Sequence, residues 1–489
     1  MAEILSQDEI DKLLTGINAS PTQSKTEVNR RISQCQKEGK TQLDLSGCNL
    51  KTVPSKITEL THITALNVSH NDIKTLPVSI GNLSALEVLD ISDTKITALP
   101  ESIGNLTALE KIIIAHTSLK TLPESIGNLT ALKSLFLQDT SLKTLPAAIG
   151  NLSALEVLHI DDTHLSDLPE SIGKLTALKK LHLSNTQLKT LPAAIENLIA
   201  LEVLYIDNKY LSDLPASMGN LKALKTVHLY NTQLQTLPAF IGNLRALQKI
   251  HIRNNHINAL PDSIGNMTAL EEIRINDEPI GALPESIGKL SSLKSLFLEY
   301  TSLKALPASI GNLTALEELH INDKHLSALP ESIGNITTLK DLSIINADIT
   351  ALPESIGNLR ALERINISNI PISALPESTG NLKALKKLLI KNTNLRALPE
   401  AIGNLTALEK IYIWGPIHTL PESIGNLGSL ITLEVFGIKK DLPSLAFKLP
   451  PALRKLTLSG EEGSTFDYYD FQRVPVPNEQ FSRGDRQAR

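Results

Sequence analysis

The chain has 489 residues, a formal net charge of −5 at pH 7 and a sequence pI near 6.2. Nucleic-acid-binding domains usually carry a basic footprint, so this charge balance argues against a nucleic-acid partner. The sequence contains two cysteines, Cys35 and Cys48, which indicates a reducing compartment rather than a disulfide-linked secreted scaffold. The sequence lacks an apolar run of about 18 residues, so we expect no membrane span.

Residues 1–16 predict a short amphipathic helix, and the polar residues 17–26 predict a linker after it. Ser6 and Glu9 have the spacing of a capping box, which marks the start of a helix. The apolar side chains that share one helix face are Ile10, Leu13 and Leu14. Because so short a helix is marginal alone, we expect it to dock in a groove of another protein.

The stretch LSQDEIDKLL within this helix resembles the N-terminal peptide of the bacterial flagellar switch protein FliM, which docks on the phosphorylated response regulator CheY. Lys12 stands where that peptide usually has alanine. The resemblance implies charged contacts and apolar anchors at Glu9, Ile10, Asp11, Leu13 and Leu14. Two other interpretations remain: a helix that folds back on the rest of the chain, or a segment that serves as an export signal.

Residues 27–39 predict a capping helix. Val28, Ile32 and Cys35 recur at positions i, i+4 and i+7, so their side chains share one face. We expect this face to cover the open core of the first repeat. Cys35 is therefore interpreted as a packing residue rather than a reactive thiol.

Residues 40–460 repeat a unit of 23 residues, and its prolines recur at that spacing from Pro54 to Pro399. One unit reads PESIGNLTALEKIIIAHTSLKTL. Ile112 and Ile114 alternate with exposed positions, which predicts a short strand with one buried face. A single unit cannot bury its apolar side chains alone, so we expect the units to stack on one another.

This spacing of leucine, isoleucine and proline resembles the leucine-rich repeat, in the class with an L-P-x-x-I-G-N-L segment. The resemblance implies an α/β solenoid: a horseshoe with a concave parallel β-sheet and an irregular, 3-10 or short helical convex side. In the family, asparagine at the position of Thr117 forms a ladder along the inner turn. Threonine is usual here. We expect irregular turns where the position is taken by Lys209, Glu278, Lys324, Ala347, Ile370 and Pro416.

The outward positions of each strand need no particular side chain for folding, yet aromatic residues gather there. Eight phenylalanines, seven tyrosines and one tryptophan make 16 aromatic residues, and eight of them fall at or beside these positions. Aromatic residues are enriched where proteins dock. The predicted partner-binding residues of the concave face are Phe136, His159, His182, Tyr205, His228, Tyr230, His251, Arg274, Phe297, Tyr300, His320, Tyr412 and Trp414. The alternative is that duplicated repeats carried neutral residues along.

The histidines of this face suggest a metal site or a pH switch, because neighbouring parallel strands lie about 4.8 Å apart. Tyr205 interrupts the histidine row, and a linear row does not wrap a tetrahedral ion easily. We therefore expect no metal, and an electrostatic role for the histidines beside Asp161, Asp162 and Asp207.

Enzyme activity and a cofactor are not expected. The recurring Ile-Gly-Asn is interpreted as a solenoid turn rather than a phosphate-binding loop, and a flat array of strands offers no nucleophile elbow or oxyanion hole. Some bacterial effectors that resemble this array carry a C-terminal ubiquitin-ligase domain with a catalytic cysteine. The last thirty or so residues of this sequence contain no cysteine, and we predict a C-terminal cap or tail over residues 461–489.

The sequence thus predicts a non-enzymatic adaptor that binds a protein partner on the concave face. Residues 4–17 would tether it to a CheY-like regulator or another component of flagellar or type III machinery. The alternative is a type III-secreted effector that binds a host protein. We expect a cytoplasmic location because the start of the chain lacks the basic and apolar segments of a signal peptide, with export into a host cell as the alternative. The sequence leaves the oligomeric state open.

Overall fold

The computed structural model describes residues 25–438, 449–460 and 465–470, and these fall into two compact units. Unit 1 is Met1–Ile280 and unit 2 is Gly281–Arg489. The predicted docking helix of residues 1–16 lies outside the described residues. Most of the predicted tail, 461–489, also lies outside them.

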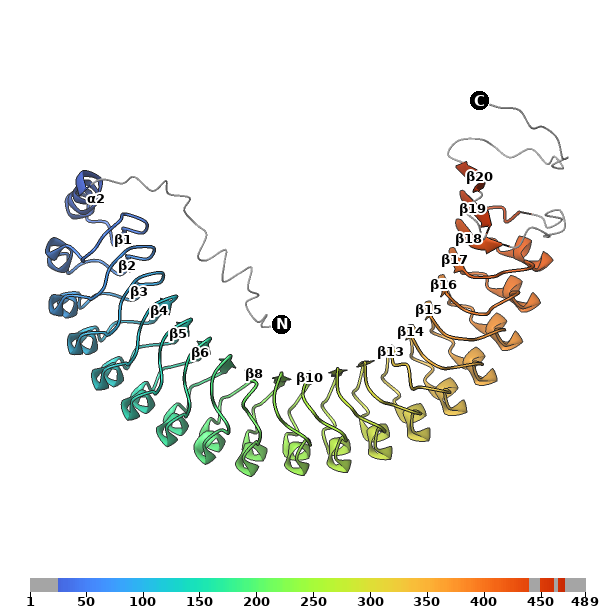
Figure 1. Cartoon of the computed structure of the whole chain (residues 1–489), viewed down its shortest axis with the longest axis horizontal. Coiled ribbons are helices and arrows are strands. Elements are labelled where there is room, and N and C mark those ends of the chain that lie inside the picture. Colours follow the sequence, from blue (N-terminus) through green and yellow to red (C-terminus); the bar gives the residue numbers. More distant parts are fainter. Residues whose placement is uncertain (1–24, 439–448, 461–464, 471–489) are drawn as a thin grey trace. The chain divides into compact units, whose positions relative to one another are not determined.

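The described part of unit 1 begins with helix α2 (Lys25–Glu38), which packs against the first strand (Figure 1). Its buried side chains are Val28, Ile32 and Cys35. Arg31 Nη1 donates a hydrogen bond to the carbonyl oxygen of Asp44, at 2.9 Å. The helix starts two residues before the predicted residue 27, so the end of the predicted linker is helical. Glu27 in the first turn favours this start, because a carboxylate there complements the helix dipole.

A parallel sheet follows in unit 1, in which each strand pairs with the next one in the sequence (Figure 1). Its strands are β1 (Gln42–Asp44), β2 (Ala65–Asn67), β3 (Val88–Asp90), β4 (Lys111–Ala115), β5 (Ser134–Gln138), β6 (Val157–Asp161), β7 (Lys180–Ser184), β8 (Val203–Asp207), β9 (Thr226–Tyr230), β10 (Lys249–Arg253) and β11 (Glu272–Asn276). The register places residues 23 apart side by side, so Phe136 lies opposite His159 and His159 opposite His182. Equivalent side chains therefore form continuous rows.

Unit 2 has the same strand arrangement from β12 to β19, and β20 then pairs antiparallel to β19. Its strands are β12 (Ser295–Glu299), β13 (Glu318–Asn322), β14 (Asp341–Ile345), β15 (Arg364–Ser368), β16 (Lys387–Lys391), β17 (Lys410–Trp414), β18 (Thr432–Ile438), β19 (Lys455–Gly460) and β20 (Thr465–Asp470).

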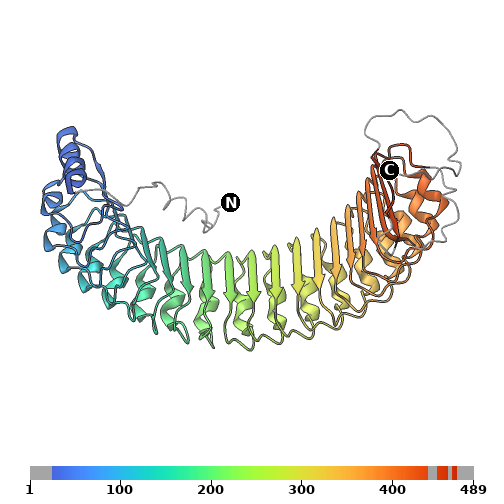
Figure 2. The same ribbon diagram turned by 45° about the horizontal axis from the view of Figure 1, so that its top comes forward.

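Between strands the chain returns through 3-10 turns that lie on the side opposite the sheet (Figure 2). Each begins after a repeat proline such as Pro100, whose ring fixes φ at −71° and which has no N–H to donate. In unit 1 the turns are η1 (Ser55–Glu59), η2 (Val78–Asn82), η3 (Glu101–Asn105), η4 (Glu124–Asn128), η5 (Ala147–Asn151), η6 (Glu170–Lys174), η7 (Ala193–Asn197), η8 (Ala216–Asn220), η9 (Ala239–Asn243) and η10 (Asp262–Asn266). In unit 2 they are η11 (Glu285–Lys289), η12 (Ala308–Asn312), η13 (Glu331–Asn335), η14 (Glu354–Asn358), η15 (Glu377–Asn381), η16 (Glu400–Asn404) and η17 (Glu422–Asn426).

The parallel sheet on one side and the 3-10 turns on the other confirm the predicted α/β solenoid. The core between them consists of leucine and isoleucine, and Ile112 and Ile114 are fully buried there. Neighbouring turns approach so closely that a Cβ atom on Gly150 would lie 2.3 Å from the backbone oxygen of Ser171. This contact explains why glycine recurs in the Ile-Gly-Asn segment.

The inner turn after each strand is held by a row of buried polar side chains. Asn71 Nδ2 donates to the carbonyl oxygens of Leu45, Val68 and Ser69, each at 2.9 Å. A threonine at this position bonds fewer groups: Thr94 Oγ1 donates to the carbonyl oxygen of Ile91 at 2.8 Å. An amide offers two donors and an acceptor, whereas a hydroxyl offers a single donor.

Two predicted occupants of this row are wrong. Asn208 and Asp323 are buried in it, and Lys209 and Lys324, one residue later, are exposed. A buried lysine would lose the hydration of its charge. An amide or carboxylate instead accepts hydrogen bonds from the turn: Tyr210 N donates to Asn208 Oδ1 at 3.0 Å, and His325 N donates to Asp323 Oδ1 at 2.9 Å.

Glu278 does occupy the row, and its turn is well bonded. Its Oε1 accepts hydrogen bonds from Asn255 N and Asn255 Nδ2, both at 2.7 Å, and its Oε2 accepts one from Ile257 N at 2.9 Å. Burial raises the pKa of this carboxyl. The side chain of Glu278 therefore satisfies the inner turn in place of asparagine.

Candidate functional site

The outward side of the sheet in unit 1, called here the strand face, carries a row of aromatic rings. Consecutive ring centroids are separated by 6.1, 4.9, 5.4, 5.4 and 4.6 Å. We call this row the ring stack, and its members are Phe136, His159, His182, Tyr205, His228 and His251. Each ring is the third residue of its strand, from β5 to β10, so the 23-residue register aligns them.

Face-to-face contacts dominate the middle of the ring stack. The ring planes of His159 and His182 differ by 26°, and those of His182 and Tyr205 by 18°. Because neighbouring rings cover these faces, a molecule that approaches the strand face meets ring edges, where the nitrogen atoms and the hydroxyl lie. Aromatic pairs at such separations are favourable, so the stack is a preformed surface.

Two of the predicted site residues are less accessible than their outward position suggested. His159 and His228 are only 9% and 7% exposed. Their strand neighbours on either side, such as Leu158 and Ile160, fill the leucine core, so the histidines face outward and are covered by adjacent rings. The other ring-stack members are half-buried.

Burial keeps three of these histidines uncharged. It lowers the pKa of His159 to about 4 and, together with the neighbouring histidine and lysine, lowers that of His182 to about 4. Burial and the adjacent His251 and His182 lower the pKa of His228 to about 3. Neutral rings do not attract aspartates as cations do. The expected electrostatic role therefore does not apply to these three histidines, which instead offer hydrogen bonds.

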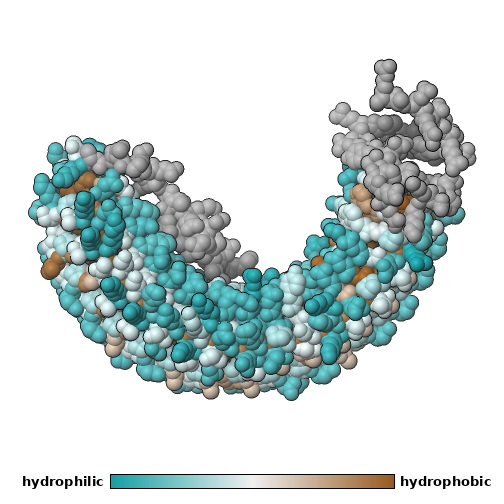
Figure 3. Space-filling view, viewed as in Figure 1, coloured by the Kyte–Doolittle hydropathy of each residue, from teal (hydrophilic) through white to brown (hydrophobic). Residues whose placement is uncertain are grey.

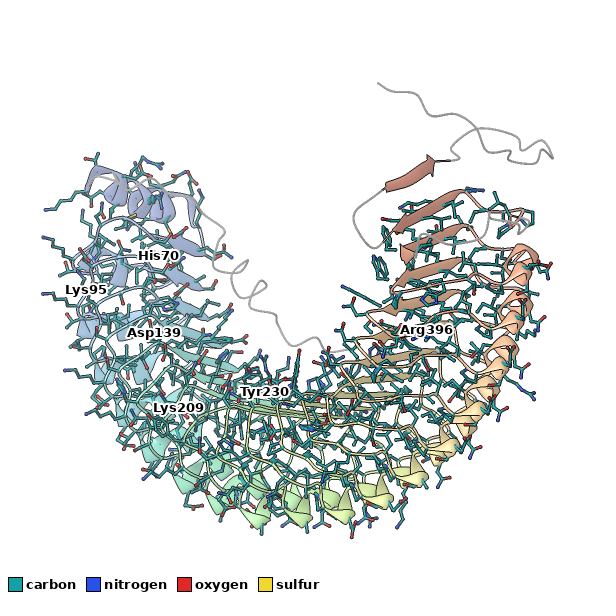
Figure 4. The ribbon with its side chains drawn as sticks, turned by 45° about the vertical axis from the view of Figure 1, so that its right-hand side comes forward. His70, Lys95, Asp139, Lys209, Tyr230 and Arg396 are labelled. Atoms are coloured by element: carbon teal, nitrogen blue, oxygen red, sulfur yellow. The ribbon has the colours of Figure 1, made fainter. Side chains whose placement is uncertain are left out.

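A hydrogen-bonded chain of four side chains closes the end of the ring stack. Glu272 Oε1 lies 3.0 Å from His251 Nε2, and Tyr230 Oη lies 3.4 Å from His251 Nδ1 and 3.0 Å from His228 Nδ1. Figure 4 shows Tyr230 on the strand side of unit 1. We call this set the relay, and its members are Glu272, His251, Tyr230 and His228.

Two cations hold Glu272 in place. Lys249 Nζ lies 3.1 Å from its Oε2, and Arg274 Nε bonds its Oε1. The hydrogen bond from His251, followed by those from Arg274 and Lys249, holds the pKa of Glu272 well below its usual range. Glu272 is not among the residues predicted from the sequence, although alternation along β11 places it on the same side as Arg274. The predicted residue Arg274 thus positions the acid of the relay.

The edge of the strand face where strands end is acidic in the middle of unit 1. Asp161 and Asp207 lie there, and each accepts a hydrogen bond from the asparagine that directly follows the next strand: Asn185 Nδ2 at 3.3 Å and Asn231 Nδ2 at 2.6 Å. Burial, and to a lesser degree the nearby carboxylates, raise the pKa of Asp161. The ring stack is therefore bordered by carboxylates on this side.

Unit 2 carries two smaller groups of rings. Phe297 and His320 stack with centroids 4.7 Å apart and planes 18° apart. Tyr412 and Trp414 are nearly parallel at 5.9 Å, and Trp414 is nearly parallel to Phe436 at 5.5 Å. Between these groups the third strand residues are Ser343, Asn366 and Leu389.

Tyr300 differs from the other predicted residues of unit 2. It follows the end of β12 and lies in the inner turn, with a φ of 50°. Its side chain is 57% exposed. The structure therefore places Tyr300 beyond the row of rings formed by Phe297 and His320.

The family of this chain follows from comparisons with known proteins. A model of the leucine-rich repeat region matches residues 41–137, 122–209, 203–279, 273–349 and 339–439, which together span most of the sequence. The chain belongs to the leucine-rich-repeat family. Members of this family are typically interaction modules, so the fold suggests a protein partner. The search of curated proteins found no match to this chain.

Solved leucine-rich-repeat structures support the same assignment. A leucine-rich-repeat protein of Leptospira interrogans is 27% identical, with a TM-score of 0.65, and the match covers 83% of this chain and 94% of that one. An internalin of Listeria monocytogenes is 23% identical over 64% of this chain and 88% of its own, with a TM-score of 0.52. A TDR receptor is 22% identical over 87% and 86%, with a TM-score of 0.61. The last two likenesses show the fold alone.

Within residues 25–438, 449–460 and 465–470, the side chains form no group of three or more histidines, cysteines or acids able to hold a metal ion. Over the same ranges, no helix has the length and apolar character needed to cross a bilayer. The thiols of Cys35 and Cys48 are buried, and burial raises the pKa of both.

Proposed function

We propose that this leucine-rich-repeat protein is a non-enzymatic interaction protein that holds a protein partner on the strand face of unit 1. The observation that carries the proposal is the ring stack: six rings in consecutive strands occupy positions that the leucine core does not require. Aromatic rings provide a large contact area and lose little side-chain entropy when a partner binds, and they are frequent at the centres of interfaces.

The dimensions of the ring stack suit such a role. Six strands from β5 to β10 span five steps of about 4.8 Å, or roughly 24 Å. A standard interface buries roughly 800 Å² on each partner, which corresponds to a patch about 28 Å across. One folded domain of a partner would therefore cover the stack and its acidic edge.

The rest of the unit 1 surface has few exposed apolar side chains that a partner could contact. The exposed large apolar side chains among its described residues are Val78, Ile199 and Tyr210, at 75%, 67% and 44%. They are separate in the sequence, and in Figure 3 the visible side of unit 1 is mainly hydrophilic with scattered apolar spots. Ile199 lies on the return segment after η7, which makes it a suitable control site.

The test is site-specific crosslinking in the full chain. A photoreactive amino acid replaces Tyr205 in one variant and Ile199 in the control. We expect one protein to be crosslinked to the variant with the photoreactive residue at position 205 and not to the variant with it at position 199. Adding His228→Ala and Tyr230→Ala should abolish this crosslinking. Equal crosslinking at both positions, or capture that survives these substitutions, would contradict binding on this face.

A second candidate function rests on the N-terminal sequence. The segment LSQDEIDKLL resembles the CheY-docking peptide of FliM, and we propose that it tethers the chain to a CheY-like regulator or another component of flagellar or type III machinery. In that role the protein would act as an adaptor in the cytoplasm.

Binding of the full chain to phosphorylated CheY tests the tether. Leu13→Ala with Leu14→Ala removes two proposed anchors and should weaken binding at least tenfold. Lys12→Ala restores the residue usual in FliM and should retain or strengthen it. A chain that does not bind CheY, or that binds equally after loss of both leucines, would rule the tether out.

The alternative is a type III-secreted effector whose N-terminal segment directs export and whose strand face binds a host protein. Fusion of residues 1–50 to a reporter separates the two ideas. Delivery of the reporter by a secretion-competent cell supports export. A reporter that stays inside such a cell contradicts it and favours a cytoplasmic adaptor.

A further inference from the structure

The relay contains one acid, two imidazoles and one hydroxyl, and their donors and acceptors are mutually constrained. The Glu272 carboxylate can only accept, so His251 Nε2 carries the hydrogen of the 3.0 Å bond between them. Tyr230 has one hydrogen and stands between two imidazole nitrogens, at 3.0 Å from His228 Nδ1 and 3.4 Å from His251 Nδ1. It can donate to only one of them.

When His251 is neutral, its hydrogen is on Nε2 and its Nδ1 is an acceptor. Tyr230 then donates to His251 Nδ1, and the Tyr230 oxygen accepts from His228 Nδ1. A neutral histidine carries one ring hydrogen. His228 Nε2 is consequently left with a lone pair and acts as an acceptor.

When His251 is protonated, the direction of the bonds reverses. His251 Nδ1 now donates to Tyr230, and Tyr230 donates to His228 Nδ1. The neutral ring of His228 then carries its hydrogen on Nε2, which becomes a donor. Both arrangements satisfy every bond of the relay, and they differ by a single proton.

The outer end of the relay is the nitrogen that changes character. His228 Nε2 is buried and has no hydrogen-bond partner among the described residues. The rings of Tyr205, Tyr230 and His251 surround it, with centroids 5.4, 5.5 and 4.6 Å from that of His228. A buried polar atom left without a partner costs about 1–3 kcal/mol, so a partner group that displaces a covering ring and bonds this nitrogen would recover that energy.

We propose that the relay is a one-proton switch that sets whether the strand face offers a hydrogen-bond acceptor or a donor at His228. With His251 neutral, the site takes a donor group of the partner, such as an amide N–H or a hydroxyl. With His251 protonated, it takes an acceptor, such as a carbonyl or carboxylate oxygen. The consequence for binding rests on the proposed function, whereas the switch itself does not.

The groups around His251 leave it as the proton acceptor of the relay. It faces His228 and Tyr230 of β9, Glu272 and Arg274 of β11, and Lys249 and Arg253 of its own strand. Burial lowers the pKa of His228 to about 3 and raises that of Tyr230, whereas the hydrogen bond from His251, followed by those from Arg274 and Lys249, lowers that of Glu272. Between pH 8 and pH 5 these three groups therefore keep their charge, and His251 is the remaining member of the relay.

Nitrogen spectroscopy of the full chain tests the switch without a partner. Histidine is labelled with ¹⁵N, and long-range ¹H–¹⁵N spectra, which distinguish the two neutral tautomers from the imidazolium, are recorded from pH 8 to pH 5. His228→Gln and His251→Gln assign the two rings. We expect His251 to become imidazolium while His228 stays neutral and moves its hydrogen from Nδ1 to Nε2 at the same midpoint.

Conservative variants separate the relay from ordinary titration. Tyr230→Phe keeps the ring and removes the hydroxyl, so His251 should still titrate while His228 no longer changes tautomer with it. Tyr205→Phe is the control, because it removes the hydroxyl of a neighbouring tyrosine that is not part of the relay. It should leave the tautomer of His228 linked to the protonation of His251, as in the wild type. Glu272→Gln removes the counter-charge of the imidazolium, so both transitions should move together to lower pH. Circular dichroism confirms that each variant is folded.

One tautomer of His228 across the whole range, or a His251 that stays neutral down to pH 5, would overturn the switch. The consequence for recognition is then measured with the protein captured at Tyr205. Its affinity should change by up to tenfold per pH unit over the His251 transition, and Tyr230→Phe should abolish that dependence. If no protein is captured, the proposed function fails while the spectra still decide the switch.

Discussion

Units 1 and 2 are built from the same repeat, and the difference between them lies on the outward side of the sheet. In unit 1 the third strand residue is a ring in six consecutive strands, from Phe136 to His251. After Arg274 interrupts the row, the first two strands of unit 2 carry the rings of Phe297 and His320, and Ser343 follows them. The leucine and isoleucine positions are filled alike in both units. The core therefore fixes the fold and leaves the strand face free to differ.

The side chains at the edge of the sheet where the strands end also differ between unit 1 and unit 2. In unit 2 a row of amides runs from Asn322 to Asn346, Asn369 and Asn392, with successive Nδ2 to Oδ1 distances of 2.8, 2.7 and 2.8 Å. In unit 1 the corresponding bonds end on the carboxylates of Asp161 and Asp207. The edge beside the ring stack therefore carries negative charge, and the edge of unit 2 is neutral over these four residues.

The largest effects should strike both units equally, because they concern the shared repeat. Gly150→Ala in unit 1 and Gly357→Ala in unit 2 each place a Cβ atom 2.3 Å from a backbone oxygen of the next turn. Overpacking against backbone should cost about 3 kcal/mol in each case, measured by urea unfolding. Gly281→Ala is the control, since its Cβ would meet no atom within 4 Å. A loss confined to one unit would contradict a common packing rule.

The next largest effects concern the buried carboxylates of the inner turns. Glu278→Ala in unit 1 and Asp323→Ala in unit 2 each leave buried donors without an acceptor. We expect a loss of about 2 kcal/mol for each, again by urea unfolding. Lys209→Ala and Lys324→Ala, at the exposed neighbours of Asn208 and Asp323, should change stability by less than about 0.5 kcal/mol. Greater sensitivity at the lysines would contradict the placement of the row.

The pH dependence of the Glu278 contribution follows from its raised pKa. The folded chain holds this proton more tightly than the unfolded chain, so the stability contribution is complete below about pH 4.3, the ordinary glutamate value. It is lost as the pH rises through the raised value. Glu278→Gln lacks this loss, so the unfolding free energy of the wild type should fall relative to that of the variant between pH 4 and pH 8. A difference that does not change with pH would contradict burial of the acid.

Partner binding should separate the two units. Tyr205→Ala in the ring stack should weaken the proposed partner at least tenfold, which corresponds to about 1.4 kcal/mol at a central aromatic contact. The matched substitution in unit 2 is Tyr412→Ala, which also removes a tyrosine at a third strand position and should change affinity less than twofold. Titration calorimetry with the captured protein gives both values. The opposite order would move the site to unit 2.

The smallest effect concerns one turn of unit 2. Tyr300 is the tyrosine in a set of left-handed turn residues that are otherwise asparagine, aspartate or histidine. Asparagine adopts this backbone conformation more readily, so Tyr300→Asn should raise the unfolding free energy by about 0.5–1 kcal/mol. Asn346→Tyr makes the reverse change in the same unit and should lower it by a similar amount. Unchanged stability in both variants would mean that the turn carries no strain.

Much of the fold could be predicted from the repeat itself. Alternation at Ile112 and Ile114 predicted the strand, and the 23-residue period predicted that the units stack, because both patterns can be read from the order of residues alone. The candidate site was predicted less completely. Alternation placed His251 and Arg274 on the strand face but did not reveal that Glu272 would bond both. That contact depends on rotamers and on the stagger between neighbouring strands.

The inner turn also shows which features the sequence predicts and which it does not. A fixed count of 23 residues pointed to Lys209 and Lys324, yet Asn208 and Asp323 occupy the row, because burying an amide or carboxylate with partners costs less than burying an ammonium group. The periodic sequence by itself determined the solenoid, since core positions recur wherever a leucine or isoleucine must be buried. Only the tertiary structure decided which polar side chains meet, because hydrogen bonds between repeats depend on side-chain geometry that the period does not specify.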